Sequence, residues 1–579
     1  MHEKNRSLRV TAISFPFLSS LPLQPPPSLF SSAHVCHRSV TAGVWQIQGN
    51  SLQLQTPRVE PLGAELLASV ASAGPGPGHT LALDTLTADR TYSSGERSHC
   101  DPQGPFSDVA HWRTVMGSMS KSPNILLIHS DQHRYDCLGV NGHPFIETAN
   151  LDRLAAEGMN FTHAFTPIPL CTPARNCLLH GQWSFQHGNI MNADSEAPAE
   201  PPVGLPSFSR QLRDQDYYLA YVGKWHVSTT RGPDAYGFCE FPSHDAYDQW
   251  RESQGCPPAE YANGWFGETV SGRTPEQTHL AWCADQTIDY LRKGADHEGG
   301  FFIRWDPPEP HLPNIVPEPY ASMYPPETIP PWPNFDDPLD GKPIVQRQQL
   351  RTWKIDDWTW EDWAPIVGRY LGEISLMDAQ IGRVLAALEE LGLVDNTLVI
   401  YTTDHGDECG SHGMIDKHFV MYDELVRVPL IARWPGRIEP GSRCDSFVSH
   451  EIDLATTFCE VAGAPVPETF QGQSLIPLMG GGRNDRQDIL SAYHGNQFGL
   501  FSQRMVRDRR WKYVWNATAE DELYDLDSDP HELTNRTGDP ACAGELTRLR
   551  HRLIDWMRQT NDPLCNEWIV TQLSEDLSI

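Results

Sequence analysis

Residues 169 to 181 read Pro169-Leu170-Cys171-Thr172-Pro173-Ala174-Arg175-Asn176-Cys177-Leu178-Leu179-His180-Gly181. Pro173 fixes its own backbone torsion and suits the first turn of a helix. Cys171 then falls at or just before a helix N-terminus, where amide groups favour negative charge and a thiol ionises easily. Arg175 lies one turn along the same face. The pattern indicates either a nucleophile beside a fixed cation or a half-buried cysteine followed by a surface arginine.

The composition excludes several classes of function. The 579 residues carry a net charge of −31, which argues against a nucleic-acid partner and requires a local positive site for any anionic substrate. The 13 cysteines are scattered without CxxC pairs, so they form neither a disulfide framework nor a zinc cage. A reducing compartment, the cytoplasm, is the expected location. No apolar run is long enough to span a membrane, so no membrane partner is expected.

Residues 1–118 differ in composition from the rest of the chain. They contain the low-complexity stretches Gln24-Pro25-Pro26-Pro27-Ser28 and Gly74-Pro75-Gly76-Pro77-Gly78. Such segments bury too little apolar surface to offset chain entropy, which predicts a disordered N-terminal extension. A basic start followed by a weakly apolar run hints at a secretory signal, but Pro16 and Pro22 interrupt it. A periplasmic or secreted protein remains the alternative if that signal is real.

Polar residues follow two apolar runs that are typical of buried parallel strands. The run Asn124–His129 is followed by Asp131 and Gln132, and the run Thr397–Thr402 is followed by Asp404 and His405. In open α/β sheets, ligands bind beyond the carboxyl ends of the strands. If both strands lie in one sheet, these four residues meet as metal ligands; otherwise each pair is a polar turn. An oxygen-rich set with one imidazole suits Ca²⁺ or Mn²⁺ better than structural Zn²⁺.

Three further segments carry candidate site residues. After a predicted strand at 217–222, Lys224 and His226 stand two apart and can face one site together. His311 lies in the run Pro307-Pro308-Glu309-Pro310-His311-Leu312-Pro313, whose prolines stiffen the loop. Lys417 follows the second strand. Each alone is also compatible with an ordinary surface lysine, a core histidine or a rigid surface loop.

The remaining patterns indicate packing. An apolar stripe at helical spacing predicts a core helix over 366–391. Two short runs, 502–506 and 511–515, predict a hairpin, and a later helix carries Leu546, Leu549, Leu553 and Met557. They indicate a small sheet-and-helix subdomain at 485–579, after a catalytic domain at 121–484. One acidic region is rich in tryptophan. These residues could form a stacking platform for a sugar or pack a lid: Trp332, Trp353, Trp358, Trp360 and Trp363.

Taken in order, these motifs resemble the sulfatase family over roughly residues 121–579. Cys171-Thr172-Pro173-Ala174-Arg175 resembles the signature Cys-x-Pro-[Ser/Ala]-Arg, and Gly223-Lys224-Trp225-His226 resembles a second signature. The resemblance implies an α/β alkaline-phosphatase-like fold, with a central mixed sheet flanked by helices and a smaller C-terminal subdomain. It also implies that Cys171 is converted to formylglycine (3-oxoalanine) by a formylglycine-generating enzyme, a maturation partner.

The resemblance further implies the roles of the site residues. Asp131, Gln132, Asp404 and His405 would bind one divalent cation, with Ca²⁺ expected and Mn²⁺ or Mg²⁺ as alternatives. Arg175 would stabilise the nucleophilic oxygen of hydrated formylglycine 171. Lys224, Lys417 and His311 would bind the sulfate, His311 would protonate the leaving alcohol, and His226 would act as a base. The expected activity is hydrolysis of a sulfate monoester on a carbohydrate or an aryl group.

The metal ligands depart from the pattern of many well-known sulfatases, which have Asp where this chain has Gln132 and Asn where it has His405. The combination resembles some bacterial sulfatases and also the phosphonate monoester hydrolases, which use the same formylglycine. Hydrolysis of a phosphonate monoester or phosphodiester is therefore the alternative function. A third hypothesis is a non-catalytic relative that holds carbohydrate on its tryptophan-rich surface.

Overall fold

The chain divides into two units, Met1–Gln103 and Gly104–Ile579, and each is described by itself. The computed structural model describes residues 44–48, 51–55, 122–193, 200–258, 264–270, 272–495 and 499–575. In the first unit, strands β1 (Val44–Gln48) and β2 (Ser51–Gln55) pair antiparallel. Apart from this pair, residues 1–118 lie outside the described residues, so the disordered extension expected there stays a prediction.

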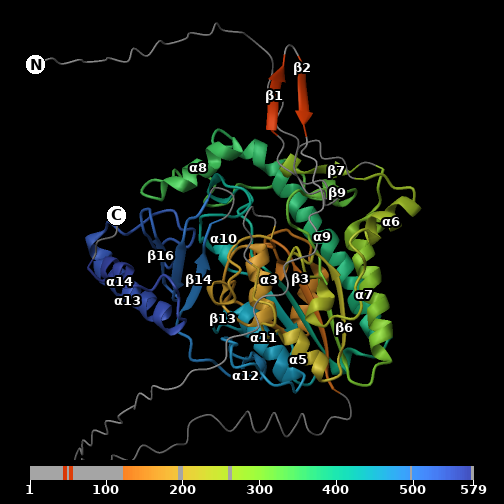
Figure 1. Ribbon diagram of the computed structural model, residues 1–579. Helices are drawn as coiled ribbons and strands as arrows, with labels where there is room; N and C mark the ends of the chain where they lie inside the picture. The colour runs from red at the N-terminus through yellow and green to blue at the C-terminus, as the bar shows by residue number, and fades with distance from the viewer. Residues whose placement is uncertain are drawn as a thin grey trace, which may run out of the picture. The chain divides into compact units, whose positions relative to one another are not determined.

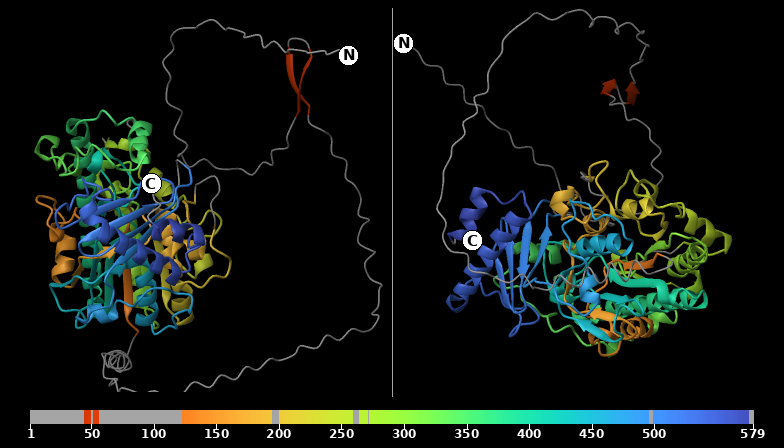
Figure 2. Two further views of the ribbon diagram at one scale, coloured as in Figure 1. Left: turned by 90° about the vertical axis from the view of Figure 1, so that its left-hand side faces the viewer. Right: turned by 90° about the horizontal axis from the view of Figure 1, so that it is seen from below.

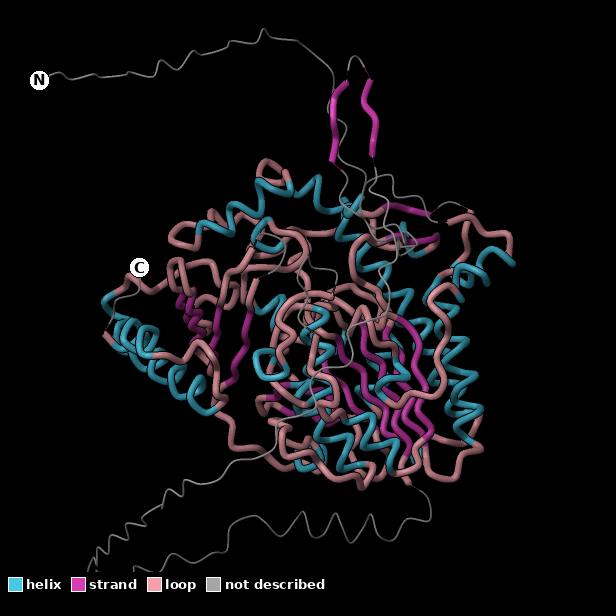
Figure 3. Tube along the Cα trace, viewed as in Figure 1, coloured by secondary structure: helices cyan, strands magenta, loops and turns pink. Residues whose placement is uncertain are grey.

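A mixed sheet forms the centre of the second unit (Figures 1 and 3). It has seven strands, in the order β12-β4-β11-β10-β3-β8-β6. Four neighbouring strands run parallel: β10 (Thr397–Thr403), β3 (Asn124–Ser130), β8 (Phe301–Asp306) and β6 (Tyr218–Gly223). On the other side of β10, strand β11 (Leu430–Arg433) pairs antiparallel with both β10 and β4 (Met159–Phe161), and β12 (Ser442–Cys444) pairs parallel with β4. The predicted central mixed sheet is confirmed.

The register brings the carboxyl ends of the parallel strands to one edge. Thr403 at the end of β10 lies opposite Ser130 at the end of β3. Gly223 at the end of β6 lies opposite Asp306 at the end of β8. Residues that directly follow these strands therefore lie close together in space, although they are far apart in sequence.

Helices cover both faces of the sheet because its central strands are apolar on both sides. On β3, Ile125 and Leu127 pack with residues of α3, α5 and α11, whereas Leu126 and Ile128 pack with residues of α2, α7 and α9. The first layer consists of α3 (Cys171–His180), α5 (Phe208–Asp214) and α11 (His450–Val461). The second consists of α2 (Ala149–Ala156), α7 (His279–Ala295) and α9 (Trp360–Glu390). The helix predicted over 366–391 is α9, which begins six residues earlier.

A four-stranded antiparallel sheet lies near the C-terminus (Figure 2). Its strands are β14 (Ile489–Tyr493), β15 (Gln503–Arg507), β16 (Trp511–Asn516) and β17 (Glu522–Asp525). The predicted hairpin is β15 and β16, which pair antiparallel. Helix α13 (Ala543–Gln559) buries Leu546, Leu549, Leu553 and Met557 in the cluster that also contains residues of this sheet, and α14 (Glu567–Ser574) follows.

The remaining elements are short. They are β5 (Ala164–Phe165) paired with β13 (Val448–Ser449), β7 (Glu268–Val270) paired with β9 (Ile315–Pro317), and helices α4 (Ser184–His187), α6 (Ala246–Ser253), α8 (Ile344–Trp353), α10 (Asp423–Val426) and α12 (Ile476–Met479). Among the described residues, no helix combines the length and the apolar character that crossing a bilayer requires. The described cysteines are all free thiols.

The tryptophan-rich region packs inward. Trp363 is buried, and Trp353, Trp358 and Trp360 lie half-buried against it. The same cluster contains Leu312, next to His311, and Ile415, two residues before Lys417. These rings therefore support the loops that carry two predicted site residues.

Candidate active site

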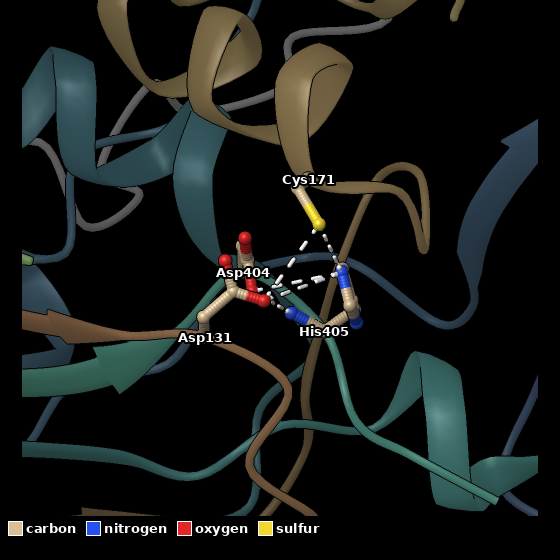
Figure 4. Close-up of side chains that lie close together, drawn as sticks. All are labelled: Asp131, Cys171, Asp404 and His405. Carbon is tan, nitrogen blue, oxygen red and sulfur yellow. Dashed lines mark hydrogen bonds and ion pairs between the residues drawn. The ribbon is translucent and has the colours of Figure 1, made fainter. Parts of the chain in front are cut away.

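Cys171 is the first residue of α3, and its side chain points toward the strand ends (Figure 4). Its Sγ lies 3.2 Å from Nε2 of His405 and 3.7 Å from Oδ1 of Asp131. Burial and the charge of Asp131 raise the pKa of the thiol. The positive charges of Lys224, Lys417 and His405 lower it by more, so the pKa lies well below its usual range. The sequence-based prediction of an easily ionised group at a helix N-terminus agrees with this arrangement.

Two strand ends supply the other members of the cluster in Figure 4. Asp131 follows β3, and Asp404 and His405 follow β10. All three side chains are fully buried, and their ligand atoms and the sulfur of Cys171 lie within 4.8 Å of one another. The shared sheet that sequence analysis required for this meeting is therefore present.

Arg175 is buried among three carboxylates. Its Nη2 lies 2.7 Å from Oδ2 of Asp131 and 3.0 Å from Oδ2 of Asp404, and its Nη1 lies 2.6 Å from Oδ2 of Asp306. Burial lowers the pKa of Arg175, but the three carboxylates raise it well above its usual value. The guanidinium is thus a permanent cation that joins the ends of β3, β8 and β10.

Lys224 brings a second positive charge to the thiol. Its Nζ lies 2.7 Å from Oδ2 of Asp131 and 3.8 Å from Sγ of Cys171. Burial alone would raise the pKa of Asp131, but Lys224, His311 and Arg175 hold it well below its usual range. His226 lies two residues beyond Lys224 on the same loop, half-buried and with a positive φ of 38°.

Lys417 and His311 form a neighbouring pair. Nζ of Lys417 donates to Nε2 of His311 at 3.0 Å and to Oδ1 of Asp416 at 2.9 Å. Nδ1 of His311 donates to the carbonyl of Leu312 at 2.6 Å, so Nε2 is the acceptor atom. Burial lowers the pKa of Lys417, but Asp416, Cys171 and Asp131 raise it well above its usual value. The pair therefore keeps a proton beside the site.

Gln132 directs its side chain to this pair and not to the thiol. Its Oε1 accepts from Nζ of Lys417 at 2.7 Å, and its Nε2 donates to Asp407 and, at 3.0 Å, to Oδ1 of Asp416. Its backbone N–H donates to Oδ1 of Asp404 at 3.2 Å. Gln132 thus links the metal-ligand candidates to Lys417.

The donor set fits a divalent cation. Nδ1 of His405 lies 2.9 Å from the carbonyl of Gly406, which can only accept, so Nε2 is the atom that faces Asp131 and Cys171. Burial lowers the pKa of this imidazole, but Asp404 and Cys171 raise it to about 9. Two carboxylates and one imidazole attract positive charge at the point where a cation would bind. Asp131, Asp404 and His405 would hold it.

Sequence reasoning missed Asp306, Asp407 and Asp416. Asp306 ends β8 and holds both Arg175 and Arg304, the latter through Nη2 at 2.6 Å. It stands at the end of a predicted strand, as Asp131 does, and this position was the feature of the sequence that could have indicated it. Asp407 and Asp416 lie in a long loop whose path only tertiary contacts define.

Comparison with known proteins agrees with this geometry. The sequence model of the sulfatase family matches residues 123–464, and that of the N-sulphoglucosamine sulphohydrolase C-terminal region matches residues 410–559. An arylsulfatase of Clostridium perfringens is 30% identical over 473 residues, which cover 75% of this chain and 94% of that protein. An N-acetylglucosamine-6-O-sulfatase of Bacteroides thetaiotaomicron is 26% identical and covers 77% of this chain and 88% of its own. The crystal structure of the phosphonate monoester hydrolase of Agrobacterium radiobacter matches with a TM-score of 0.68 at 28% identity, covering 76% of this chain and 96% of that chain.

The chain therefore belongs to the sulfatase family of the alkaline phosphatase superfamily, as the sequence motifs predicted. It is a hydrolase that acts on sulfuric ester bonds. The predicted α/β fold, with its central mixed sheet and smaller C-terminal sheet, is confirmed.

Proposed function

We propose that the protein hydrolyses sulfate monoesters by attack of residue 171 after its cysteine is oxidised to formylglycine. The observation that carries this proposal is the position of Cys171. It begins α3, and its sulfur lies within 3.8 Å of His405, Asp131 and Lys224. The hydrated aldehyde would supply an oxygen nucleophile where the sulfur now stands. Conversion requires a formylglycine-generating enzyme as maturation partner.

One divalent cation completes the proposed site. Asp131, Asp404 and His405 would bind it, with Gln132 as the candidate fourth ligand, and the cation would stabilise charge on the sulfate and on the attacking oxygen. Ca²⁺ is the expected ion because most donors are oxygens, with Mn²⁺ or Mg²⁺ as alternatives. Arg175 stays locked between carboxylates. Its Nε, which has no hydrogen-bond partner among the described residues, is the donor left for residue 171.

The sulfate oxygens would be bound by Lys224, Lys417 and His311. Nζ of Lys417 donates to Nε2 of His311 in the resting structure, which holds a proton beside that nitrogen. Transfer through that nitrogen would make His311 the general acid. His226, on the same loop as Lys224, is the proposed base for the remaining hydroxyl of residue 171. These positive groups also resolve how an acidic protein attracts an anionic substrate.

The substrate class is a sulfated carbohydrate or an aryl sulfate. Support comes from relatives described as an arylsulfatase and an N-acetylglucosamine-6-O-sulfatase. The segments at 231–275 and 313–363 would set specificity, because they converge beside His311: β7 pairs with β9, and Trp265 and Trp353 pack in one cluster with Leu312. A cytoplasmic location is proposed on the cysteine content and is testable by fractionation.

A second candidate function is hydrolysis of phosphonate monoesters or phosphodiesters. It is favoured by the pair Gln132 and His405 and by the structural match to a phosphonate monoester hydrolase. The non-catalytic carbohydrate-binding alternative has less support, since the complete set of site residues is present and the tryptophans pack inward.

The deciding experiment measures kcat/KM for an aryl sulfate and for an aryl phosphonate monoester. The protein is co-expressed with a formylglycine-generating enzyme, and Cys171→Ala is the control. A clear preference for the sulfate supports the first proposal. A preference for the phosphonate replaces it with the second, and no turnover together with retained glycan binding supports the non-catalytic alternative.

A further inference from the structure

A second cluster of metal-ligand side chains lies in the loop that follows Asp404 and His405. Glu408, His412 and Glu424 each offer one ligand atom, and these atoms lie within 4.8 Å of one another. Glu408 and His412 are each 1% exposed, whereas Glu424, on α10, is half-buried. The cluster is therefore closed on the protein side and reaches solvent through Glu424. The proposed reaction does not use it.

Glu408 gives the independent sign that something binds here. Neither of its carboxylate oxygens has a hydrogen-bond partner among the described residues, and neither does Oδ1 of the neighbouring Asn334. Arg134 is near but is committed elsewhere: its Nε donates to Asp136, and its Nη1 donates to the backbone carbonyl of Glu408 and to Ser411. A buried carboxylate without a partner is costly, so it requires either a proton or a cation.

His412 is oriented as a metal ligand would be. Its Nδ1 donates to Oδ2 of Asp337 at 2.6 Å, and its ring stacks on Tyr422 with centroids 3.8 Å apart. Lys342 contacts the same carboxylate of Asp337. A carboxylate that holds one ring nitrogen fixes the tautomer and leaves the other nitrogen to coordinate. Here that other atom is Nε2, which faces the side-chain amide of Asn334.

Asn334 connects the ligand candidates. Its Nδ2 lies 2.9 Å from Nε2 of His412 and 2.8 Å from Oε1 of Glu424, so the amide group reaches both. Turning the amide about its last torsion would exchange this nitrogen for Oδ1, a further oxygen donor. Two carboxylates, one imidazole and one amide oxygen form a mixed nitrogen and oxygen set. Such a set, which repeats the donor types proposed for the catalytic cation, accepts Mn²⁺ and also Zn²⁺.

We propose that Glu408, His412, Glu424 and Asn334 form a second site for a divalent transition-metal cation, separate from the proposed catalytic one. The ion would join α10 and the segment around Asn334 to the loop that leaves β10. Glu408 N–H donates to the carbonyl of Asp416 at 3.0 Å, one residue before Lys417. The site thus stabilises the loop that carries Lys417, and its role is structural. The proposal goes beyond the proposed function and does not depend on it.

The test is a count of bound metal. The full chain is stripped with chelator, reloaded with Zn²⁺ or Mn²⁺, desalted, and analysed by inductively coupled plasma mass spectrometry. The expected result is two ions per chain in the native protein, one in Glu408→Gln, one in Asp404→Asn and none in the double variant. Glu373→Gln is the matched control, since it changes another buried carboxylate, one that Asn314 already hydrogen-bonds, and is expected to keep both ions.

His412→Asn guards against a folding failure of Glu408→Gln, because asparagine tolerates the positive φ of 52° at this position. It should also bind one ion fewer, and reloading with metal should raise Tm less in either variant than in the native protein, because only the ion at Asp404 remains. Glu408→Gln with an unchanged ion count would overturn the proposal. The proposal would also be overturned if Glu408→Gln bound as many ions as the native protein and had a higher Tm than it in metal-free buffer. That result would show that Glu408 holds a proton. The count from Asp404→Asn reports separately on the catalytic site.

Discussion

Sγ of Cys171 lies 3.2 Å from Nε2 of His405, although 234 residues separate them in the sequence. This contact joins the N-terminus of α3 to the end of β10. It places residue 171, the proposed nucleophile, beside the proposed cation. Together with Lys224 and Lys417, His405 also lowers the pKa of the thiol.

Replacing Cys171 should remove turnover without removing the fold. Cys171→Ala deletes the group that is oxidised and leaves Asp131, Arg175 and Lys224 in place. We expect kcat for an aryl sulfate to fall by at least about 10³-fold, since covalent catalysis is lost. Unfolding and substrate affinity, measured by calorimetry, should change little. Residual activity within tenfold of the native enzyme would exclude residue 171 as the nucleophile.

Asp306→Asn should weaken both stability and catalysis. It removes a buried partner of Arg175 and Arg304 and leaves charge uncompensated, which typically costs about 3–5 kcal/mol. We expect a lower denaturant midpoint and a lower kcat. Asp285→Asn is the control because its partner Arg383 is 45% exposed, and its loss should cost less than about 1 kcal/mol. Equal effects of the two substitutions would show that Asp306 has no special role.

His311→Asn should slow poor leaving groups more than good ones. His311 receives a hydrogen bond from Lys417 and is the proposed donor to the departing oxygen. Loss of a general acid lowers kcat by about 10²–10⁴-fold for alkyl sulfates, whereas an activated nitrophenyl sulfate needs little protonation. The measurement is a series of kcat values against leaving-group pKa. A slope equal to that of the native enzyme would assign His311 to binding alone.

The stability of the chain should depend on pH through Asp378 on α9. This carboxyl accepts from the backbone N–H groups of Asn150 and Leu151, yet burial raises its pKa to about 6. The folded protein therefore binds this proton more tightly than the unfolded chain does. Its contribution, on the order of 3 kcal/mol, is present below about pH 4 and is lost as the pH rises to about 6.

Denaturant titrations of the native protein and of Asp378→Asn between pH 4 and 7 test this expectation. The variant should lack the component that falls with rising pH, because asparagine does not titrate. Identical pH profiles for the two proteins would contradict it. Asp285→Asn, which changes an exposed carboxyl on α7, is the control.

Much of the fold could be predicted because its patterns are local. The apolar runs that became β3 and β10 need no partner to be recognised, and the helical stripe of α9 repeats along the chain. The helix start at Cys171 follows from Pro173 and the residues beside it. The order of the motifs then indicated the family, and with it the candidate residues Asp131, Asp404 and His405.

The arrangement of charges around those residues required the tertiary structure. Asp306 holds Arg175 only because β8 lies next to β3, and a sequence does not state which strands are neighbours. Gln132 was expected only among the metal ligands, yet its side chain contacts Lys417, because a long loop returns that lysine to the strand ends. The sequence by itself determined which residue types stand at the ends of the strands and at the start of α3. The packing of distant segments decided which of them touch, because contact energies depend on distances that chain order does not specify.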